Sequence, residues 1–402
     1  MTKSKNLMGL NGNEAIAYAV KQCNVDVVSA YPITPQTIIV EKFSEFVADG
    51  EVKCAFVPVE SEHSALSVCI GAAALGARTF TATSSQGLAL MWELMYIASG
   101  LRLPIVMAVV NRALSAPINI HCDHSDSMGC RDSSWIQIYC EDAQEAYDTT
   151  IQAFRIAEHE FVQLPVMITI DGFTISHTMQ NVNLLRDDDV KSFVDVRKPI
   201  NIEIPNRGKL PMILDPENPL TFGSLDLYDY YFEHKLQQHE AIKNADKVVK
   251  EVHDEYFKIS GRRYGDGLID AYGLEDAEDV IIVLGSTAGT VRYVTKKLRH
   301  EGKKVGMLRI RTFRPFPIKE LTELLKNVKN VGVMDRSGFY GGVGGPVFVE
   351  TIAAFYNLKR QPKFVNYIYG LGGRDTPPKI IEKVFEELPT TEWGEVRFLG
   401  VR

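Results

Sequence analysis

The chain has 402 residues, of which 45% are hydrophobic and 24% are charged, and its formal net charge is −7. This length predicts two or three domains of a globular protein. The acidic balance excludes a general nucleic-acid or anionic-membrane binder, because such proteins carry a basic excess. No stretch resembles a signal peptide or approaches the roughly 18 apolar residues of a membrane span, so we expect a cytoplasmic protein.

The first 175 residues alternate short apolar runs with segments of helical spacing. This alternation predicts a mostly parallel sheet covered on both faces, whose ligands bind beyond the carboxyl ends of the strands. The predicted strands are 27–30, 55–59, 79–82, 105–110 and 166–170, and the predicted helices are 37–47, 62–75, 88–97 and 143–158.

The alternation stops at about residue 181 and resumes at residue 279. The intervening proline- and aromatic-rich stretch predicts a linker that wraps around the protein and ends in a helix over 233–259. Helices at 289–300, 319–325 and 346–355 alternate with strands in the last part. We therefore divide the chain into an α/β domain (1–180), a wrapping segment (181–264) and a smaller α/β domain (265–402).

Six cysteines stand at positions 23, 54, 69, 122, 130 and 140. Their spacing forms no CxxC motif, zinc site or iron–sulfur run, so we expect reduced and mostly buried thiols. Any metal centre used by this protein is then expected on another chain.

The segment SAYPITPQT follows the first predicted strand. Thr34 is in a position to cap the next helix, with Pro35 as its first residue and Pro32 sharpening the exit from the strand. A Thr34 hydroxyl at the end of a strand is also placed to donate to a carbonyl or carboxylate, and the two roles are compatible.

The segment VPVESEHSAL has the same strand–turn–helix layout. Ser61 is a candidate N-cap, and Glu60 and Glu62 then fall at a helix start, where the helix dipole favours carboxylates. The small residues of GAAALGA behind them indicate the close approach of another segment. The acidic residues are therefore either dipole partners or members of a buried site.

The loop TSSQG provides hydrogen-bonding groups in Ser84, Ser85 and Gln86, and Gly87 allows close approach of the backbone. An ordinary capped loop is the alternative. The stretch 111–135 begins with Arg112 directly after a strand, a position suited to a bidentate carboxylate receptor. Its HxDH pattern lacks a partner glutamate, so we expect no metal there; the alternative is a salt-bridged surface loop.

These motifs together resemble the α subunits of 2-oxoacid:ferredoxin oxidoreductases. YPITP, ESEHSA, TSSQG, NRALSAPINIHCDHSD, RDSSWIQ, QEAYD and DGFTISH occur in the family's order, and RIRTFRPFP, VGVMDRS and YGLGGRD are similar to its second domain. The resemblance covers residues 8–385. It implies two parallel-sheet α/β domains: a thiamine-diphosphate aminopyrimidine-binding domain and a transketolase C-terminal-like domain.

The family resemblance implies an oxidoreductase that is active only as a multi-subunit complex. A β subunit would supply the diphosphate and Mg²⁺ site with one 4Fe–4S cluster, a δ subunit two more clusters, and a γ subunit would complete a dimer of αβγδ units. Coenzyme A would be co-substrate and ferredoxin the electron acceptor. The GDG at 265–267 starts a diphosphate motif but lacks its later asparagine, so we expect a turn there.

The resemblance also implies roles for single residues. Its S-E-x-x-A context selects Glu62 over Glu60 as the carboxylate bound to N1′ of the aminopyrimidine. Arg112 and Thr34 would hold the substrate carboxylate, and YPITP favours pyruvate as the substrate. Further contacts with the cofactor are expected from Pro32, Ile33, Ser85 and Gln86.

Three other functions fit part of the pattern. An oxidoreductase for branched-chain or other 2-oxoacids would keep similar α-subunit motifs. A non-redox thiamine enzyme, such as half of a transketolase, would also divide its active site between chains. A silent scaffold subunit is the third alternative, and the intact set of Glu62, Thr34 and Arg112 argues against it.

Overall fold

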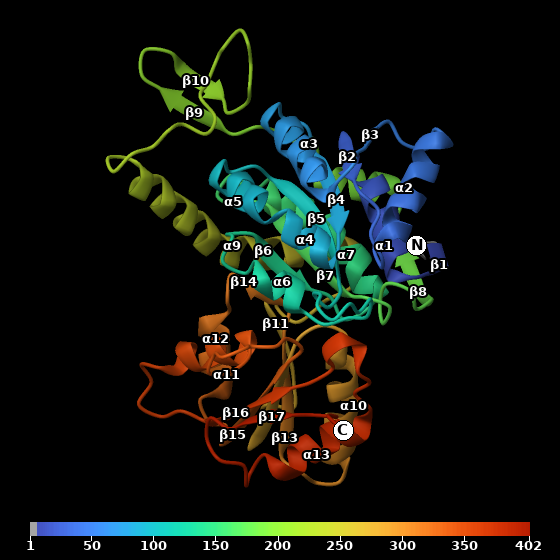
Figure 1. Cartoon of the computed structure of the whole chain (residues 1–402), viewed down its shortest axis with the longest axis vertical. Helices are drawn as coiled ribbons and strands as arrows, with labels where there is room; N and C mark the ends of the chain where they lie inside the picture. The colour runs from blue at the N-terminus through green and yellow to red at the C-terminus, as the bar shows by residue number, and fades with distance from the viewer. Residues whose placement is uncertain (1–5) are drawn as a thin grey trace.

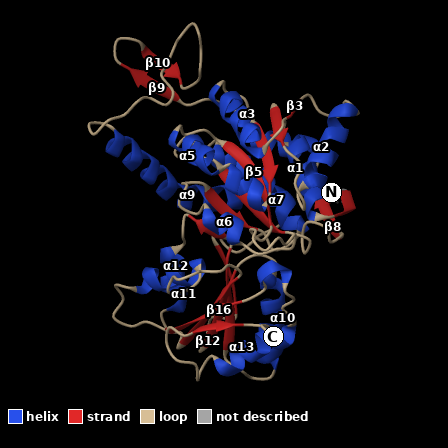
Figure 2. Ribbon diagram, viewed as in Figure 1, coloured by secondary structure: helices blue, strands red, loops and turns tan. Residues whose placement is uncertain are grey.

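The computed structural model describes residues 6–402, which form two α/β units lying one above the other in Figure 1. The first unit is built on a seven-stranded sheet and the second on a six-stranded sheet. Parallel strands dominate both sheets, and helices flank them (Figure 2). The predicted fold class, two parallel-sheet α/β domains, is confirmed.

The sheet of the first unit has the strand order β14-β6-β7-β5-β4-β2-β3. Every residue of β4 and β5 is buried, as expected of strands covered on both faces, and β5 is almost entirely apolar. The six parallel strands are β2 (Val27–Ala30), β3 (Ala55–Pro58), β4 (Thr79–Thr83), β5 (Ile105–Asn111), β6 (Ile136–Tyr139) and β7 (Val166–Asp171).

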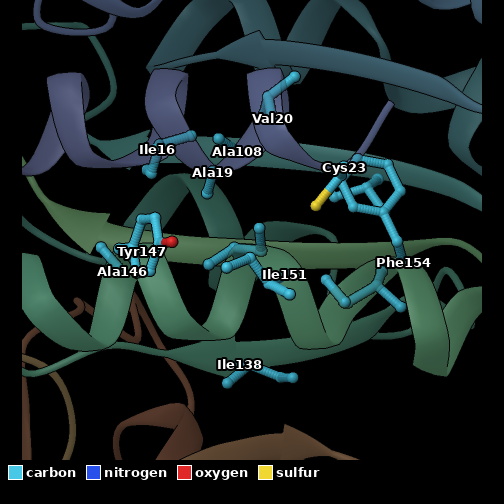
Figure 3. Close-up of a cluster of buried hydrophobic side chains, with 14 of the residues drawn as sticks. Ile16, Ala19, Val20, Cys23, Ala108, Ile138, Ala146, Tyr147, Ile151 and Phe154 are labelled. Carbon is cyan, nitrogen blue, oxygen red and sulfur yellow. The ribbon is translucent and has the colours of Figure 1, made fainter. Parts of the chain in front are cut away.

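Helices cover both faces of this sheet. On one face α1 and α7 pack together through Ile16, Val20, Ile151 and Phe154 (Figure 3). The predicted helix over 88–97 is two helices that meet at Met91. The helices of the unit are α1 (Gly12–Gln22), α2 (Thr37–Ala48), α3 (Glu62–Ala74), α4 (Ser85–Leu90), α5 (Trp92–Gly100), α6 (Ser125–Gly129) and α7 (Ala143–Ala157).

The segment after the first unit wraps around it. Strand β8 (Gln180–Leu184) pairs with β1 (Asn6–Leu10), and α8 (Asp187–Val194) packs beside α7. A hairpin of β9 (Asn201–Ile204) and β10 (Gly208–Pro211) projects away from the body at the upper left of Figure 1.

The chain returns from this hairpin through the long helix α9 (Tyr231–Ser260), which packs against α7 and α5. Its buried residues Ala245 and Val249 belong to the core of the first unit. The turn after α9 contains the expected GDG: Gly265 and Gly267 have positive φ, and the Asp266 carboxylate accepts from the Leu268 and Ile269 amides.

The second unit has the strand order β11-β13-β12-β15-β16-β17, with only β11 antiparallel to its neighbour. Its strands are β11 (Ile269–Tyr272), β12 (Asp279–Val283), β13 (Val305–Ile310), β15 (Asn330–Asp335), β16 (Lys363–Ile368) and β17 (Val396–Phe398). Its helices are α10 (Thr287–His300), α11 (Ile318–Leu325), α12 (Pro346–Phe355) and α13 (Pro378–Glu387).

The two units are joined by a shared strand and by a buried ion cluster. Strand β14 (Thr312–Arg314) leaves the second unit and pairs antiparallel with β6. Beside it, Arg309 and Arg311 contact the Glu145 carboxylate of α7 at 2.5 and 2.7 Å, and all three residues are buried. The two guanidinium groups outweigh burial and hold the pKa of Glu145 at about 2.

The cysteines are free thiols, and most of them lie in the protein core. All six cysteines are free, and five of them are buried, with only Cys54 partly exposed. Burial raises the pKa of the Cys69 thiol to about 12 and that of Cys54 to about 11, which keeps both protonated at neutral pH. Across residues 6–402, every helix is too short or too polar to cross a membrane.

Candidate active site

Four of the sequence motifs meet at one edge of the first sheet. YPITP follows β2, ESEHSA follows β3, TSSQG follows β4 and NRALS follows β5. These strands are neighbours and run parallel, so their carboxyl ends open onto the same edge. This is where parallel α/β sheets bind ligands.

The turn after β2 corrects one expectation. Helix α2 begins at Thr37, and residues 34–36 form a turn before it, so Thr34 is not the N-cap. Instead the Gln36 side chain fixes this turn: its amide donates to the Ala82 carbonyl at 2.8 Å and accepts from the Ile33 amide at 3.2 Å. A glutamine that pairs with a strand 46 positions away gives no local capping signal.

The YPITP turn leaves its own side chains accessible. Thr34 and Pro32 are exposed and Ile33 is half-buried. The Pro35 carbonyl accepts a 2.8 Å hydrogen bond from the buried Asn13 side chain of α1. The backbone of this turn is thus anchored, while Thr34 itself is exposed.

The two glutamates of the E-S-E motif have different surroundings. Ser61 caps α3 by accepting from the Ser64 amide at 3.2 Å, which confirms the predicted N-cap. Glu62 is then the first helical residue and its exposed fraction is only 7%. Glu60 is exposed and accepts from the Ser64 hydroxyl, which lowers the pKa of Glu60. The buried carboxylate is therefore that of Glu62.

The Glu62 carboxylate lies against the glycine of the TSSQG turn. A Cβ built on Gly87 would fall 2.7 Å from Glu62 Oε1 and 2.4 Å from Thr83 Oγ1. Any other residue at position 87 would push the carboxylate away. Among the described residues, three buried polar atoms near these turns have no hydrogen-bond partner: Thr83 Oγ1, Ser84 Oγ and Asn111 Oδ1. Unpaired polar atoms of this kind are suited to a polar ligand.

Ser85 connects the turn after β4 with the turn after β5. Its φ is +48°, and its hydroxyl donates to the Ala113 carbonyl at 2.6 Å. The Gln86 side-chain oxygen lies 2.7 Å from the same hydroxyl. Ser85 is fully buried and Gln86 half-buried, so Gln86 is the more accessible of the two residues.

Arg112 is nearly buried and has no acidic partner in the described part of the chain. Its guanidinium donates to the Thr34 carbonyl at 2.9 Å and to the Asn119 carbonyl at 3.2 Å. The structure thus brings Arg112 and Thr34 together, although 78 positions separate them. Two neutral acceptors leave the positive charge uncompensated, which makes this position favourable for an anion.

The HxDH pattern lies between the two units. Ligand atoms of Cys122, His124 and Asp171 lie within 4.8 Å of one another. Asp171 is already held by His124 at 2.7 Å and by Arg336 of the second unit at 2.8 Å, and these contacts keep the pKa of Asp171 well below its usual range. The bound guanidinium of Arg336 opposes a metal cation at this point.

Two family models match most of the chain. Residues 18–254 match the model of the family described as pyruvate flavodoxin/ferredoxin oxidoreductase, thiamine diphosphate-binding, and residues 277–381 match that of pyruvate:ferredoxin oxidoreductase core domain II. The chain belongs to the pyruvate:ferredoxin oxidoreductase family. In this oxidoreductase family the first unit is the thiamine-diphosphate-binding domain.

Relatives match the chain over nearly its whole length. It is 52% identical to the pyruvate synthase subunit PorA of Thermotoga maritima, covering 98% of each chain. It is 48% identical to PorA of Methanocaldococcus jannaschii, covering 98% of this chain and 97% of the relative. The ketoisovalerate oxidoreductase subunit VorA of Pyrococcus abyssi is 44% identical, covering 94% of this chain and 92% of the relative.

A solved structure supports the family's fold. The 2-oxoglutarate:ferredoxin oxidoreductase of Magnetococcus marinus, with 2-oxoglutarate, coenzyme A and succinyl-CoA bound, matches with a TM-score of 0.72 at 22% identity. The match covers 96% of this chain and 66% of that one. This likeness shows that the two-unit arrangement is shared.

Proposed function

We propose that this family member is the α subunit of a pyruvate:ferredoxin oxidoreductase, or pyruvate synthase. The complex converts pyruvate and coenzyme A to acetyl-CoA and CO₂ with reduction of ferredoxin, or runs the reverse carboxylation. The names of the Thermotoga and Methanocaldococcus relatives support this reaction. The observation that carries the proposal is the buried Glu62 carboxylate at the sheet edge that also holds the unpaired Arg112.

The residues at this edge fit the aminopyrimidine of thiamine diphosphate. A buried carboxylate at a helix start, a glycine that leaves room beside it and unpaired hydroxyl groups form a cradle for a flat polar ring. When bound, thiamine diphosphate supplies a carbon nucleophile for the 2-keto carbon. Glu62 would hold a proton at ring atom N1′, and the low exposure of its carboxylate strengthens that hydrogen bond. The Pro32 and Ile33 backbone and the Gln86 side chain would contact the ring.

Arg112 and Thr34 would bind the carboxylate of the 2-oxoacid. The guanidinium is fixed by the Thr34 and Asn119 carbonyls and retains donors for an anion. Thr34, whose backbone carbonyl accepts from this guanidinium, is exposed, and its hydroxyl would supply a further donor. This arrangement orients the acid group of the substrate while Glu62 acts on the cofactor.

The site would be completed by a partner subunit. Helices α3 and α5 pack side by side, and Leu90 and Trp92, at the junction of α4 and α5, are exposed. Exposed apolar side chains on the helices that follow the TSSQG turn are typical of a protein interface. We assign the Mg²⁺ and diphosphate site to a β subunit, the 4Fe–4S clusters to the β and δ subunits, and the whole to a cytoplasmic dimer of αβγδ units that reduces ferredoxin.

The first test concerns cofactor binding by this chain alone. We expect the isolated chain to fold and to bind thiamine diphosphate and Mg²⁺ only weakly, because the diphosphate ligands belong to the partner. The α and β chains combined are the expected minimal binding unit. Isothermal titration calorimetry on both samples measures the difference. Micromolar affinity of the isolated chain would contradict the divided site.

Arg112→Ala in the assembled complex should raise the KM for pyruvate steeply. The substrate carboxylate loses its charged partner, and losses of this kind are commonly about 2–5 kcal/mol. Arg112→Lys should recover only part of the effect, since an ammonium cannot replace a planar two-pronged donor. Steady-state kinetics measure both variants. An unchanged KM in Arg112→Ala would remove this arginine from the substrate site.

Thr34→Val should lower kcat/KM for pyruvate with little change in melting temperature. The hydroxyl is exposed and does not cap α2, so its loss removes a substrate donor and spares the fold. Thr34→Ser keeps the donor and is the matched control, with nearly unchanged kinetics expected. If Thr34→Val and Thr34→Ser gave equal kcat/KM values, another residue would be the donor.

A branched-chain 2-oxoacid is the second candidate substrate. The relative named ketoisovalerate oxidoreductase subunit VorA is 44% identical, close to the identity of several PorA relatives. The ratio of kcat/KM for pyruvate to that for ketoisovalerate, measured on the complex, decides between the two. We expect pyruvate to be preferred.

A further inference from the structure

Two turns of the site are held together by one buried carboxylate. Asp126 of the short helix α6 has an exposed fraction of 4%. Its Oδ2 accepts from the Ser85 amide and from the Arg112 amide, each at 3.0 Å. These donors lie 41 and 14 positions away along the chain. One oxygen atom thus bridges the turn after β4 and the turn after β5.

The other oxygen of Asp126 is also fully engaged. Oδ1 accepts from the Asn111 side-chain amide at 2.8 Å and from the Ser127 amide at 2.7 Å. All four partners among the described residues are neutral N–H groups. Burial outweighs these hydrogen bonds and raises the pKa of Asp126 to about 6. Across residues 6–402, no Lys, Arg or His side chain forms an ion pair with this carboxylate, so neutral N–H donors alone hold it.

An unpaired buried charge is costly for the fold, and packing alone does not require it. The turn geometry does require an acceptor, because Ser85 adopts φ +48° and directs its amide to the same point as that of Arg112. A second link, from the Ser85 hydroxyl to the Ala113 carbonyl, joins the same two turns.

We propose that Asp126 is a positioning residue that keeps the cofactor turn at Ser85–Gly87 and the substrate arginine Arg112 in a fixed relation. Through the Ser85 amide, Asp126 fixes the turn that contains Gly87, and the Glu62 carboxylate lies against Gly87. Asp126 also holds the backbone from which the Arg112 side chain extends. This inference rests on the proposed function, since it assigns Asp126 a role in that same site.

Asp126→Asn in the assembled complex tests the proposal with two readouts. An asparagine accepts hydrogen bonds at one atom only, so in either orientation it leaves two of the four N–H donors unpaired. We expect the KM for pyruvate to rise and hydrogen–deuterium exchange at C2 of the bound cofactor to slow, each by about 10-fold or more. A change in only one readout, or in neither, would overturn the proposal.

The double variant Asp126→Asn with Arg112→Ala separates positioning from a general loss of order. Because Asp126 acts on KM through Arg112, Asp126→Asn should raise KM little further once Arg112 is absent. Fully multiplicative effects on KM would show that Asp126 does not act through this arginine and would overturn the proposal.

Asp335→Asn is the matched control for removal of a buried carboxylate. Asp335 is buried, its pKa is likewise raised to about 6, and it accepts from the Val347 and Phe348 amides and the Asn366 side chain. The Asp335→Asn variant should lower the melting temperature without changing the KM for pyruvate or the exchange at C2. The same kinetic changes in Asp335→Asn would mean that both variants act through stability, which would overturn the assignment.

A further variant covers failure of Asp126→Asn to assemble. Ser85→Ala breaks the second link between the turns and removes no charge, so both readouts should shift in the same direction by a smaller factor. Unchanged readouts in Ser85→Ala would then overturn the proposal. Failure of this proposal can be told apart from failure of the proposed function. If Arg112→Ala leaves the KM for pyruvate unchanged and Glu62→Gln leaves exchange at C2 unchanged, the proposed site itself is wrong.

Discussion

Glu62→Gln in the assembled complex is expected to abolish activation of thiamine diphosphate while the subunits remain assembled. A carboxylate holds a proton at N1′ of the ring, and a neutral amide supports that state poorly. General acid–base groups commonly contribute about 10²- to 10⁴-fold to a rate. Hydrogen–deuterium exchange at C2 of the bound cofactor is the direct measurement, because it does not require turnover of pyruvate.

Glu60→Gln is the matched control for this prediction. Glu60 is two residues away, exposed and hydrogen-bonded to the Ser64 hydroxyl, so its charge is screened by water. We expect exchange at C2 within a few-fold of the natural protein. The opposite pattern, with slow exchange in Glu60→Gln and normal exchange in Glu62→Gln, would reverse the assignment within the E-S-E motif.

Glu145→Gln should strongly weaken the contact between the two α/β units. The carboxylate is the common partner of the fully buried Arg309 and Arg311, and its removal leaves Arg311 without a carboxylate partner among residues 6–402 and Arg309 with only Glu141, at 3.3 Å. Removing one partner of a buried ion pair typically costs about 3–5 kcal/mol. Scanning calorimetry of the chain should show a lower unfolding temperature and a separate transition for the second unit.

The pH dependence of this effect follows from the pKa of Glu145. That pKa is about 2 in the folded chain, below the ordinary glutamate value of 4.5. Such a group stabilises the fold fully above its unfolded pKa, and the stabilisation is lost as the pH falls toward the folded value. The stability difference between the natural chain and Glu145→Gln should therefore be constant from pH 7 to about pH 5 and shrink below about pH 4.

A control variant separates docking of the units from general destabilisation. Glu158 pairs with Arg78 at 2.7 Å, and both residues belong to the first unit. Glu158→Gln should destabilise that unit without creating a separate transition for the second one. If Glu145→Gln and Glu158→Gln gave the same single transition, the Glu145 cluster would not be the main link between the units.

The amino-acid sequence by itself determined the layered fold and most of its elements. Alternating apolar strands and amphipathic helices are local patterns, and the strands predicted at 27–30 and 105–110 correspond to β2 and β5. The Ser61 cap is equally local, because the serine and the Ser64 amide that it accepts from are three residues apart. The order of the motifs then indicated the family, which the comparisons confirmed.

Tertiary structure decided which residues meet at the site. Thr34 stands before Pro35 in a pattern typical of a helix N-cap. The turn nevertheless continues to Gln36, because the Gln36 side chain donates to the Ala82 carbonyl of another strand. Asp126 stood in an acidic stretch that also fitted a solvated loop, and only the fold brings the Ser85 and Arg112 amides to its carboxylate.

Tertiary structure also decided how the two units are connected. The pairing of β14 with β6 and the contact of Arg309 and Arg311 with Glu145 connect residues more than a hundred positions apart. Periodicity reports which face of an element is buried, but it carries no information on the partner across that face. A hydrogen bond or ion pair between distant segments is fixed by how the layers stack, so only the tertiary structure decided it.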